Sequence, residues 1–152
     1  MSITLVHLRR GASDDKYSWT PFAPNDEFNG DWWDSPPYLF DDPHFVRADG
    51  DGVEVARIEL DHDFRGSKHV GAPDLGDAAL EIQFMEVAKS YRRKGIGAAV
   101  IAILAEQYPD RRLLALSEEA DGFWASLGWD RFDFSDGPHH YRPLFIQPAE
   151  SA

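Results

Sequence analysis

Three cations and two glycines stand together in residues 92–97, which read Arg-Arg-Lys-Gly-Ile-Gly, and together they have the chemistry to bind an anion. The first N–H groups of a helix have no partner within it and lie at the positive end of its dipole. A phosphate placed there gains hydrogen bonds and charge complementarity at once. Gly95 and Gly97 would let the phosphate approach the backbone closely. The stretch therefore predicts a phosphate-binding turn.

Such a turn needs a strand before it and a helix after it, and the flanking residues have both patterns. Upstream, residues 79–88 place Leu80, Ile82 and Phe84 on one side and Glu81 and Gln83 on the other, which is the period of a strand. Downstream, residues 96–105 form an apolar run of helical length, too short to span a bilayer. We expect the order strand, basic glycine turn, helix.

Other groupings of polar residues have simpler interpretations. The histidines and acids of residues 61–69 and the pair His139 and His140 lack the spacing of metal ligands, so we interpret them as loop and strand residues and expect no metal site. Residues 49–52, Asp-Gly-Asp-Gly, lack the twelve-residue loop and final glutamate of a calcium site. They predict a hairpin turn.

Composition limits the class of protein. The chain has 152 residues, enough for one domain with a real core. It has no cysteine, which excludes disulfides and thiolate metal sites and fits a reducing cytosol. The formal net charge of −12 disfavours nucleic acids and anionic membranes and favours a cationic or amine-bearing partner, unless it serves only solubility. The first residues do not form a secretory signal, so we expect a soluble cytoplasmic protein.

The remaining pattern predicts a mixed sheet with few helices, α/β or α+β by class. Ser117 is a candidate N-cap for a helix that ends at Gly128, and residues 61–77 read as a loop. The expected further strands are residues 3–8, 44–48, 53–60, 111–116, 129–134 and 141–146.

Residues 11–43 are rich in aspartate, proline and aromatic residues and have no clear helical period. Prolines at this density break long helices, so we expect short helical turns and extended loop held by buried rings. The segment either packs as core or forms a pocket that offers rings and carboxylates to a cation. We expect a mixture of the two, with Trp32 and Trp33 mainly structural.

The turn resembles the acyl-coenzyme A pyrophosphate loop of the GNAT superfamily of N-acetyltransferases. Arg92, Gly95 and Gly97 fill its three fixed positions, and residues 123–129, Phe-Trp-Ala-Ser-Leu-Gly-Trp, resemble the family's later helix and Leu-Gly-aromatic element. A dinucleotide fold is disfavoured because Val100 stands where its third glycine belongs. The resemblance covers about residues 45–146. It implies one domain over residues 1–152, with a mixed, mostly antiparallel sheet splayed at the cofactor strand and flanked by helices.

The resemblance also implies a set of cofactor-binding residues for acetyl-CoA. Backbone amides of the turn would hold the pyrophosphate, and the strand backbone before it would pair with the pantetheine arm. Trp124 would pack against that arm or in the core, and Ser117 stands where many members have asparagine. The full implied set is Met85, Glu86, Val87, Arg92, Arg93, Lys94, Gly95, Ile96, Gly97, Ser117 and Trp124.

Catalysis in this family proceeds by direct attack of an amine on the thioester. Glu81 stands eleven residues before Arg92, where histone-acetyltransferase members keep a catalytic glutamate, and Glu86 is the reserve base. The alternative for Glu81 is a solvated residue on a sheet face. A backbone N–H such as that of Val87 would hold the oxyanion. Trp124 occupies the place of the family's usual acidic tyrosine, and an indole cannot supply a proton at neutral pH. Candidate substitutes are Ser117, Tyr141 and solvent.

Three functional hypotheses follow. The first is an acetyl-CoA-dependent N-acetyltransferase for the primary amine of a small or peptidic cationic acceptor. The second is a non-catalytic acyl-CoA-binding or sensing module of the same fold, suggested by Trp124 and by residues 11–43. The third is a protein-interaction domain whose turn binds no ligand. The identity of the acceptor and the length of the acyl group stay open, and a homodimer is possible because dimers are common in this family.

Overall fold

The computed structural model describes residues 1–149, which form two compact units. Unit one contains Met1–Leu60 and Phe84–Leu104. Unit two contains Asp61–Gln83 and the described residues from Ala105 onward. Within the described part of the chain, no helix is long and apolar enough to cross a membrane. The expectation of a single domain stays a prediction.

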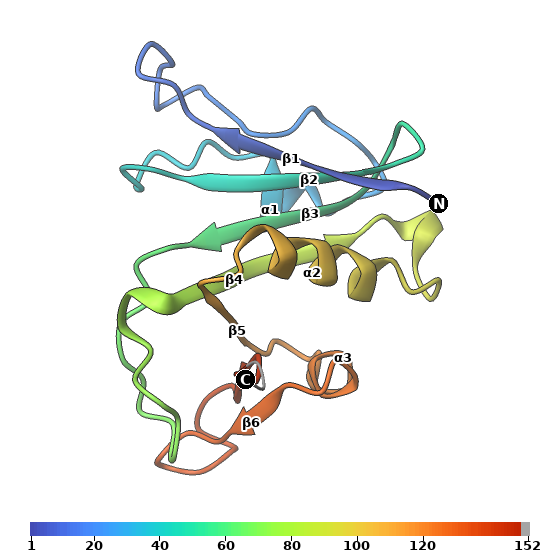
Figure 1. Cartoon of the computed structure of the whole chain (residues 1–152). Helices are drawn as coiled ribbons and strands as arrows, with labels where there is room; N and C mark the ends of the chain where they lie inside the picture. The colour runs from blue at the N-terminus through green and yellow to red at the C-terminus, as the bar shows by residue number, and fades with distance from the viewer. Residues whose placement is uncertain (150–152) are drawn as a thin grey trace. The chain divides into compact units, whose positions relative to one another are not determined.

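Seven strands form a mixed, mostly antiparallel sheet, which confirms the predicted class. The hydrogen-bonded order is β1-β2-β3-β4-β5-β7-β6. β4 and β5 pair in parallel, whereas β1 with β2, β2 with β3, β5 with β7 and β6 with β7 pair antiparallel. The strands, labelled in Figure 1 where there is room, are β1 (Ile3–Arg9), β2 (His44–Gly50), β3 (Val53–Asp61), β4 (Ala79–Val87), β5 (Arg112–Leu116), β6 (Asp130–Phe132) and β7 (Leu144–Ile146).

The hairpin of β2 and β3 in unit one closes through the turn that the sequence predicts. Asp51 and Gly52 have φ of +51° and +84°, and two successive positive φ values match the right-handed twist of the flanking strands. Aspartate and glycine tolerate this backbone better than other residues do. The register that follows sets Phe45 of β2 opposite Glu59 of β3, so these two side chains share one face of the sheet.

The helices are few and short. In α2, Val100, Ile101 and Leu104 form a buried stripe, as the spacing of a helix that packs on one side requires. The helical elements are α1 (Gly30–Trp33), α2 (Ile96–Gln107), α3 (Asp121–Ser126) and the two 3₁₀ turns η1 (Gly76–Ala78) and η2 (Lys89–Tyr91).

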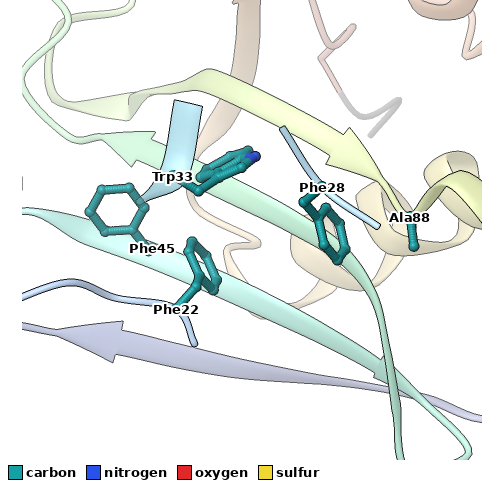
Figure 2. Packing of buried hydrophobic residues seen from close by; sticks show 5 residues of the cluster. All are labelled: Phe22, Phe28, Trp33, Phe45 and Ala88. Atoms are coloured by element: carbon teal, nitrogen blue, oxygen red, sulfur yellow. The ribbon is translucent and has the colours of Figure 1, made fainter. Parts of the chain in front are cut away.

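Within unit one, aromatic side chains hold the irregular segment of residues 11–43 against the strands, as expected. Phe22 and Trp33 meet Phe45 of β2 edge-on, with ring centroids 5.8 and 6.4 Å away. Phe28 and Ala88 complete the buried cluster, which Figure 2 shows. Edge-to-face packing of this kind stabilises beyond the area that it buries, so a segment without regular structure keeps a defined path.

A buried arginine strengthens the same cluster. Arg57 is 1% exposed and its guanidinium lies 4.5 Å from the Phe22 ring and 4.2 Å from the Phe28 ring. It also donates to the Glu54 carboxylate at 2.9 Å and to the Ala23 carbonyl at 2.9 Å. Because its charge and donors are matched, this arginine ties β3 to the irregular segment instead of destabilising the core.

Several element boundaries differ from the prediction. The last strand begins at Leu144, so Tyr141 lies before it, and β6 is limited to Asp130–Phe132. Pro143 accounts for the late start, since proline cannot donate to a strand ladder. The helix expected directly after Ser117 begins only at Asp121. Trp33 is buried as expected, but Trp32 is 46% exposed, so its expected structural role was wrong in this respect.

Unit two has a smaller core on one face of its strands. Residues 79–81 of β4 pair with residues 112–114 of β5, and β5 pairs in turn with β7. Ala79, Leu114, Leu144 and Ile146 are buried together, with Phe64, Ala72, Leu75, Leu116 and Phe132 packed against them. This packing fixes the part of β4 that carries Glu81.

Candidate functional site

The basic turn in unit one has the geometry of an anion cradle. Arg93 and Gly95 have φ of +62° and +75°, which turns the backbone sharply between η2 and α2. A Cβ built on Gly95 would meet no atom within 4 Å, so the turn leaves open space there. The first α-helical bond runs from Ala99 N–H to the Gly95 carbonyl, and the N–H groups before it lie at the positive end of α2.

The three cations of the turn are on the surface. Arg92, Arg93 and Lys94 are all exposed, and Lys94 Nζ lies 5.6 Å from the centroid of the Tyr91 ring. Ile96 and Gly97 are buried at the start of α2, so they anchor the turn. Exposed cations around open backbone fit a phosphate-bearing ligand such as the pyrophosphate of coenzyme A.

The Glu86 side chain is held by donors from three places. Its Oε1 accepts from the Asn29 N–H and from Trp33 Nε1, both at 2.9 Å, and its Oε2 pairs with Arg92 at 3.1 Å. Arg92 also donates to the Val87 carbonyl at 3.1 Å. The carboxylate thus connects α1, the end of β4 and the turn. These contacts fit a residue that positions the turn better than one that accepts a proton.

The backbone of residues 85–87 has a firm support on one side. Met85 and Val87 are half-buried, and the Ala88 N–H that follows them donates to the Val55 carbonyl of β3 at 2.8 Å. A strand held in this way is a rigid template for an extended partner along its other side.

In unit two, Glu81 is buried in β4, with 6% of its surface exposed. The alternative of a solvated residue on a sheet face is therefore wrong. Glu81 pairs with Leu114 in the parallel ladder, so the two side chains share a face, and Ala79 two residues earlier lies on that face as well. Leu114 and Ala79 are thus apolar neighbours of Glu81 on this face.

A pocket of about 250 Å³ opens on the same face of unit two. Its floor is apolar and consists of Ala79, Leu114, Leu144 and Ile146. Its rim comes from the loop that leads into β4 and includes Arg65, which is ion-paired with Asp77 at 2.9 Å.

Ser117 supports the turn before α3, but it is not the expected N-cap, because the N-cap of α3 is Ala120. Its hydroxyl donates to the Asp121 carboxylate at 2.6 Å and accepts from the Ala120 N–H at 3.2 Å, and the residue is 2% exposed. Asp121 also pairs with Arg131 of β6 at 3.2 Å. The hydrogen bond from Arg131 to Asp133 raises the pKa of this arginine, so it stays charged. These contacts fix the start of α3.

Trp124 is part of the core of unit two. It is 6% exposed, stacks on Trp129 with centroids 4.9 Å apart, and meets the Phe123 ring edge-on at the same distance. Two positions were expected for Trp124, one against the pantetheine arm and one in the core. These contacts fit the position in the core.

Tyr141 is accessible. It is 43% exposed, its hydroxyl accepts from Arg142 at 3.2 Å, and its ring packs near Phe134 and His69. His69 Nε2 donates to the Arg142 carbonyl at 2.8 Å, and its buried Nδ1 has no protein partner among the described residues. The phenol is the exposed acidic hydroxyl of this region.

The histidine groups do not form a metal centre. Among residues 1–149, no three histidine, aspartate or glutamate side chains converge closely enough to hold an ion.

The interpretation of the sequence missed Asn29 and Trp33 as supports of the turn. Asn29 caps α1 through its side chain, which accepts from the Asp31 N–H at 3.0 Å. The order Asn-Gly-Asp is a recognisable helix start. Nothing in the local sequence indicates that this helix meets Glu86, which lies 53 residues after Trp33.

A basic glycine turn that lies between a strand and a helix of a mixed sheet is typical of one class of protein. Comparison with known proteins identifies that class. The model of the acetyltransferase (GNAT) family matches residues 7–129. The chain belongs to the GNAT acetyltransferase family. Among curated proteins, no sequence relative was found.

Solved structures share the fold. An acetyltransferase from Thermus thermophilus aligns with a TM-score of 0.53 and 12% identity, over 70% of this chain and 64% of that one. YhhK from E. coli bound to coenzyme A has a TM-score of 0.53 and 12% identity, over 98% of this chain and 100% of that one. N-acetylglutamate synthase from Neisseria gonorrhoeae, complexed with coenzyme A and N-acetyl-glutamate, has a TM-score of 0.50 and 17% identity over 70% and 26%. At such identities, the likeness establishes the fold alone.

Proposed function

We propose that this protein is an acetyl-CoA-dependent N-acetyltransferase that acts on the primary amine of a small or peptidic cationic acceptor. The observation that carries the proposal is the turn of residues 92–97, where positive φ at Gly95, open space and exposed cations meet the start of α2. Coenzyme A in the E. coli neighbour supports coenzyme A as a ligand of this chain, and the N-acetylated amino acid in the Neisseria neighbour supports an amine as the acceptor group.

In the proposed reaction, a neutral amine attacks the thioester carbonyl carbon, and the C–S bond breaks as the C–N bond forms. Glu81 accepts the proton that the nitrogen loses, directly or through water. A backbone N–H such as that of Val87 holds the oxyanion. The thiolate of coenzyme A takes a proton from Tyr141. We prefer Glu81 to Glu86 as the base because Glu86 already connects α1 to the basic turn.

A thiol-release assay with acetyl-CoA and a panel of polyamines, aminoglycosides, amino acids and peptides tests the proposal. We expect turnover with at least one cationic amine, and mass spectrometry of that product should locate the acetyl group on nitrogen. Thiol release that does not depend on any amine would contradict it.

The second candidate is a non-catalytic acyl-CoA-binding module, which Trp124 in the place of the usual tyrosine favours. Calorimetry separates the two: tight acetyl-CoA binding without acetyl transfer to any amine supports the module. The absence of any coenzyme A binding would leave the protein-interaction hypothesis. Homodimerisation, a cytoplasmic location and the lack of a nucleic-acid partner stay predictions.

A further inference from the structure

Exposed apolar side chains gather at one place in unit one. Trp32, Tyr38, Leu39 and Phe40 are 46%, 49%, 80% and 54% exposed. They line a pocket of about 230 Å³, whose lining also includes Trp33, Phe45 and Glu59. Exposed aromatic rings around a pocket are typical of a ligand-binding or protein-binding surface.

The segment that supplies most of the pocket lining is acidic in sequence. Residues 19–45 contain six aspartate or glutamate residues and no lysine or arginine. Glu59 is half-buried and shares a face of the sheet with Phe45, so its carboxylate belongs to a ring-lined wall. Arg10 donates to the Phe40 carbonyl at 2.7 Å, and Arg9 pairs with Asp42 at 3.0 Å. These contacts hold the rim in place.

We propose that the pocket lined by Trp32, Tyr38, Phe40, Phe45 and Glu59 binds an alkylammonium group of the acceptor. The faces of aromatic rings attract a cation, and the effect is stronger where the cation loses part of its water. Glu59 adds a carboxylate to the lining, and the rings cover the alkyl part. The ligand class is therefore an amine that carries a second, alkyl-substituted cationic group.

The pocket of unit two has fewer rings. Phe64 is the one aromatic residue in its lining, which is otherwise aliphatic or polar and includes Arg65, ion-paired with Asp77 at 2.9 Å. A single ring offers a cation less than the several rings of the aromatic pocket do.

Two contacts connect the aromatic pocket to the proposed cofactor strand. The Trp32 ring lies 5.6 Å from the Phe84 ring of β4, and Trp33 donates to Glu86, which pairs with Arg92 of the turn. The Trp32 ring therefore lies between the pocket and the strand that is proposed to hold the pantetheine arm. That the bound cation belongs to the acetyl acceptor rests on the proposed function; the cation site itself does not.

Calorimetric titration with choline and with its uncharged isostere 3,3-dimethylbutan-1-ol tests the proposal without any need for turnover. We expect choline to bind about tenfold more tightly than the isostere, in line with a desolvated cation–π contact. Trp32→Leu, which keeps an apolar side chain at an exposed position, and Glu59→Gln should each weaken choline binding severalfold. Val70→Ala, at an exposed site of unit two, should leave it unchanged.

Equal affinity for choline and its isostere, no choline binding, or unchanged choline binding in Trp32→Leu would each overturn the cation site. Sedimentation that finds a dimer which Trp32→Leu dissociates would also overturn it, in favour of a self-association surface. Coenzyme A titrations in parallel separate the two proposals. Choline binding without coenzyme A binding contradicts the proposed function alone. Coenzyme A binding without choline binding contradicts this site alone.

Discussion

The indole of Trp33 donates to the carboxylate of Glu86 at 2.9 Å, and this bond joins the aromatic packing of unit one to the basic turn. The other oxygen of Glu86 pairs with Arg92 at 3.1 Å. The conformation of the turn therefore depends on residues far from it in the sequence. Removing the charge of Glu86 should change both stability and cofactor binding.

Glu86→Gln should lower the free energy of unfolding by about 1–3 kcal/mol, because an amide N–H₂ would face donors that now meet a carboxylate. Coenzyme A should bind several times more weakly, since Arg92 loses its support. Chemical denaturation and calorimetry measure these two effects. Glu106→Gln makes the same charge change at an exposed position of α2 and should alter neither quantity. A Glu86→Gln protein of unchanged stability would contradict the bridging role.

Gly95→Ala should weaken coenzyme A binding by about tenfold. The φ of +75° costs an L-residue about 1–2 kcal/mol, and the added methyl group enters the space that the phosphate needs. Gly52→Ala is the matched control, because Gly52 has φ of +84° and similar open space in the β2–β3 hairpin. Both variants should lose similar stability in a thermal melt. An equal effect of the two variants on coenzyme A affinity would argue against the cradle.

Arg57→Met should destabilise the protein by about 3–5 kcal/mol, since it leaves the Glu54 carboxylate without its buried partner. Replacing both residues, in Arg57→Met with Glu54→Met, should recover part of the loss. Urea denaturation of the single and double variants gives the coupling between them. If the double variant loses more stability than the two single variants lose together, the pairing assigned to Arg57 is wrong.

The features that the sequence predicted well depend on neighbouring residues. The hairpin turn at Asp51 and Gly52 needs positive φ, which few residues tolerate, so its chemistry is local. The same holds for the turn at Gly95 and for the apolar stripe of α2. Residues 92–97 therefore predicted the turn correctly, and the ligand assigned to it stays a prediction.

The features that the sequence did not reveal depend on contacts between distant segments. Trp32 and Trp33 are adjacent and chemically identical, yet one is 46% and the other 1% exposed, because neighbouring residues of a helical turn point in different directions. Composition cannot decide which of them faces the core. The three partners of Glu86 come from Asn29, Trp33 and Arg92, and no periodic pattern connects them.

Glu81→Gln should lower kcat by at least about 100-fold, the usual contribution of a positioned base, and leave the affinity for coenzyme A unchanged. Glu106→Gln again serves as the control for charge. A kcat within about threefold of wild type would mean that the amine arrives already neutral and needs no carboxylate.

Tyr141→Phe should lower kcat by about tenfold or more with little change in KM, because the variant keeps the ring and loses only the hydroxyl that is proposed to protonate the thiolate. Its stability should not change, since the contacts with Phe134 and His69 involve the ring.

Ser117→Ala should behave in the opposite way. It should cost about 1 kcal/mol of stability through the lost contacts with Asp121 and the Ala120 N–H and retain kcat. Steady-state kinetics and thermal melts of the pair distinguish the two roles. A large loss of kcat in Ser117→Ala alone would assign the proton to the serine hydroxyl, and unchanged kcat in both variants would assign it to solvent.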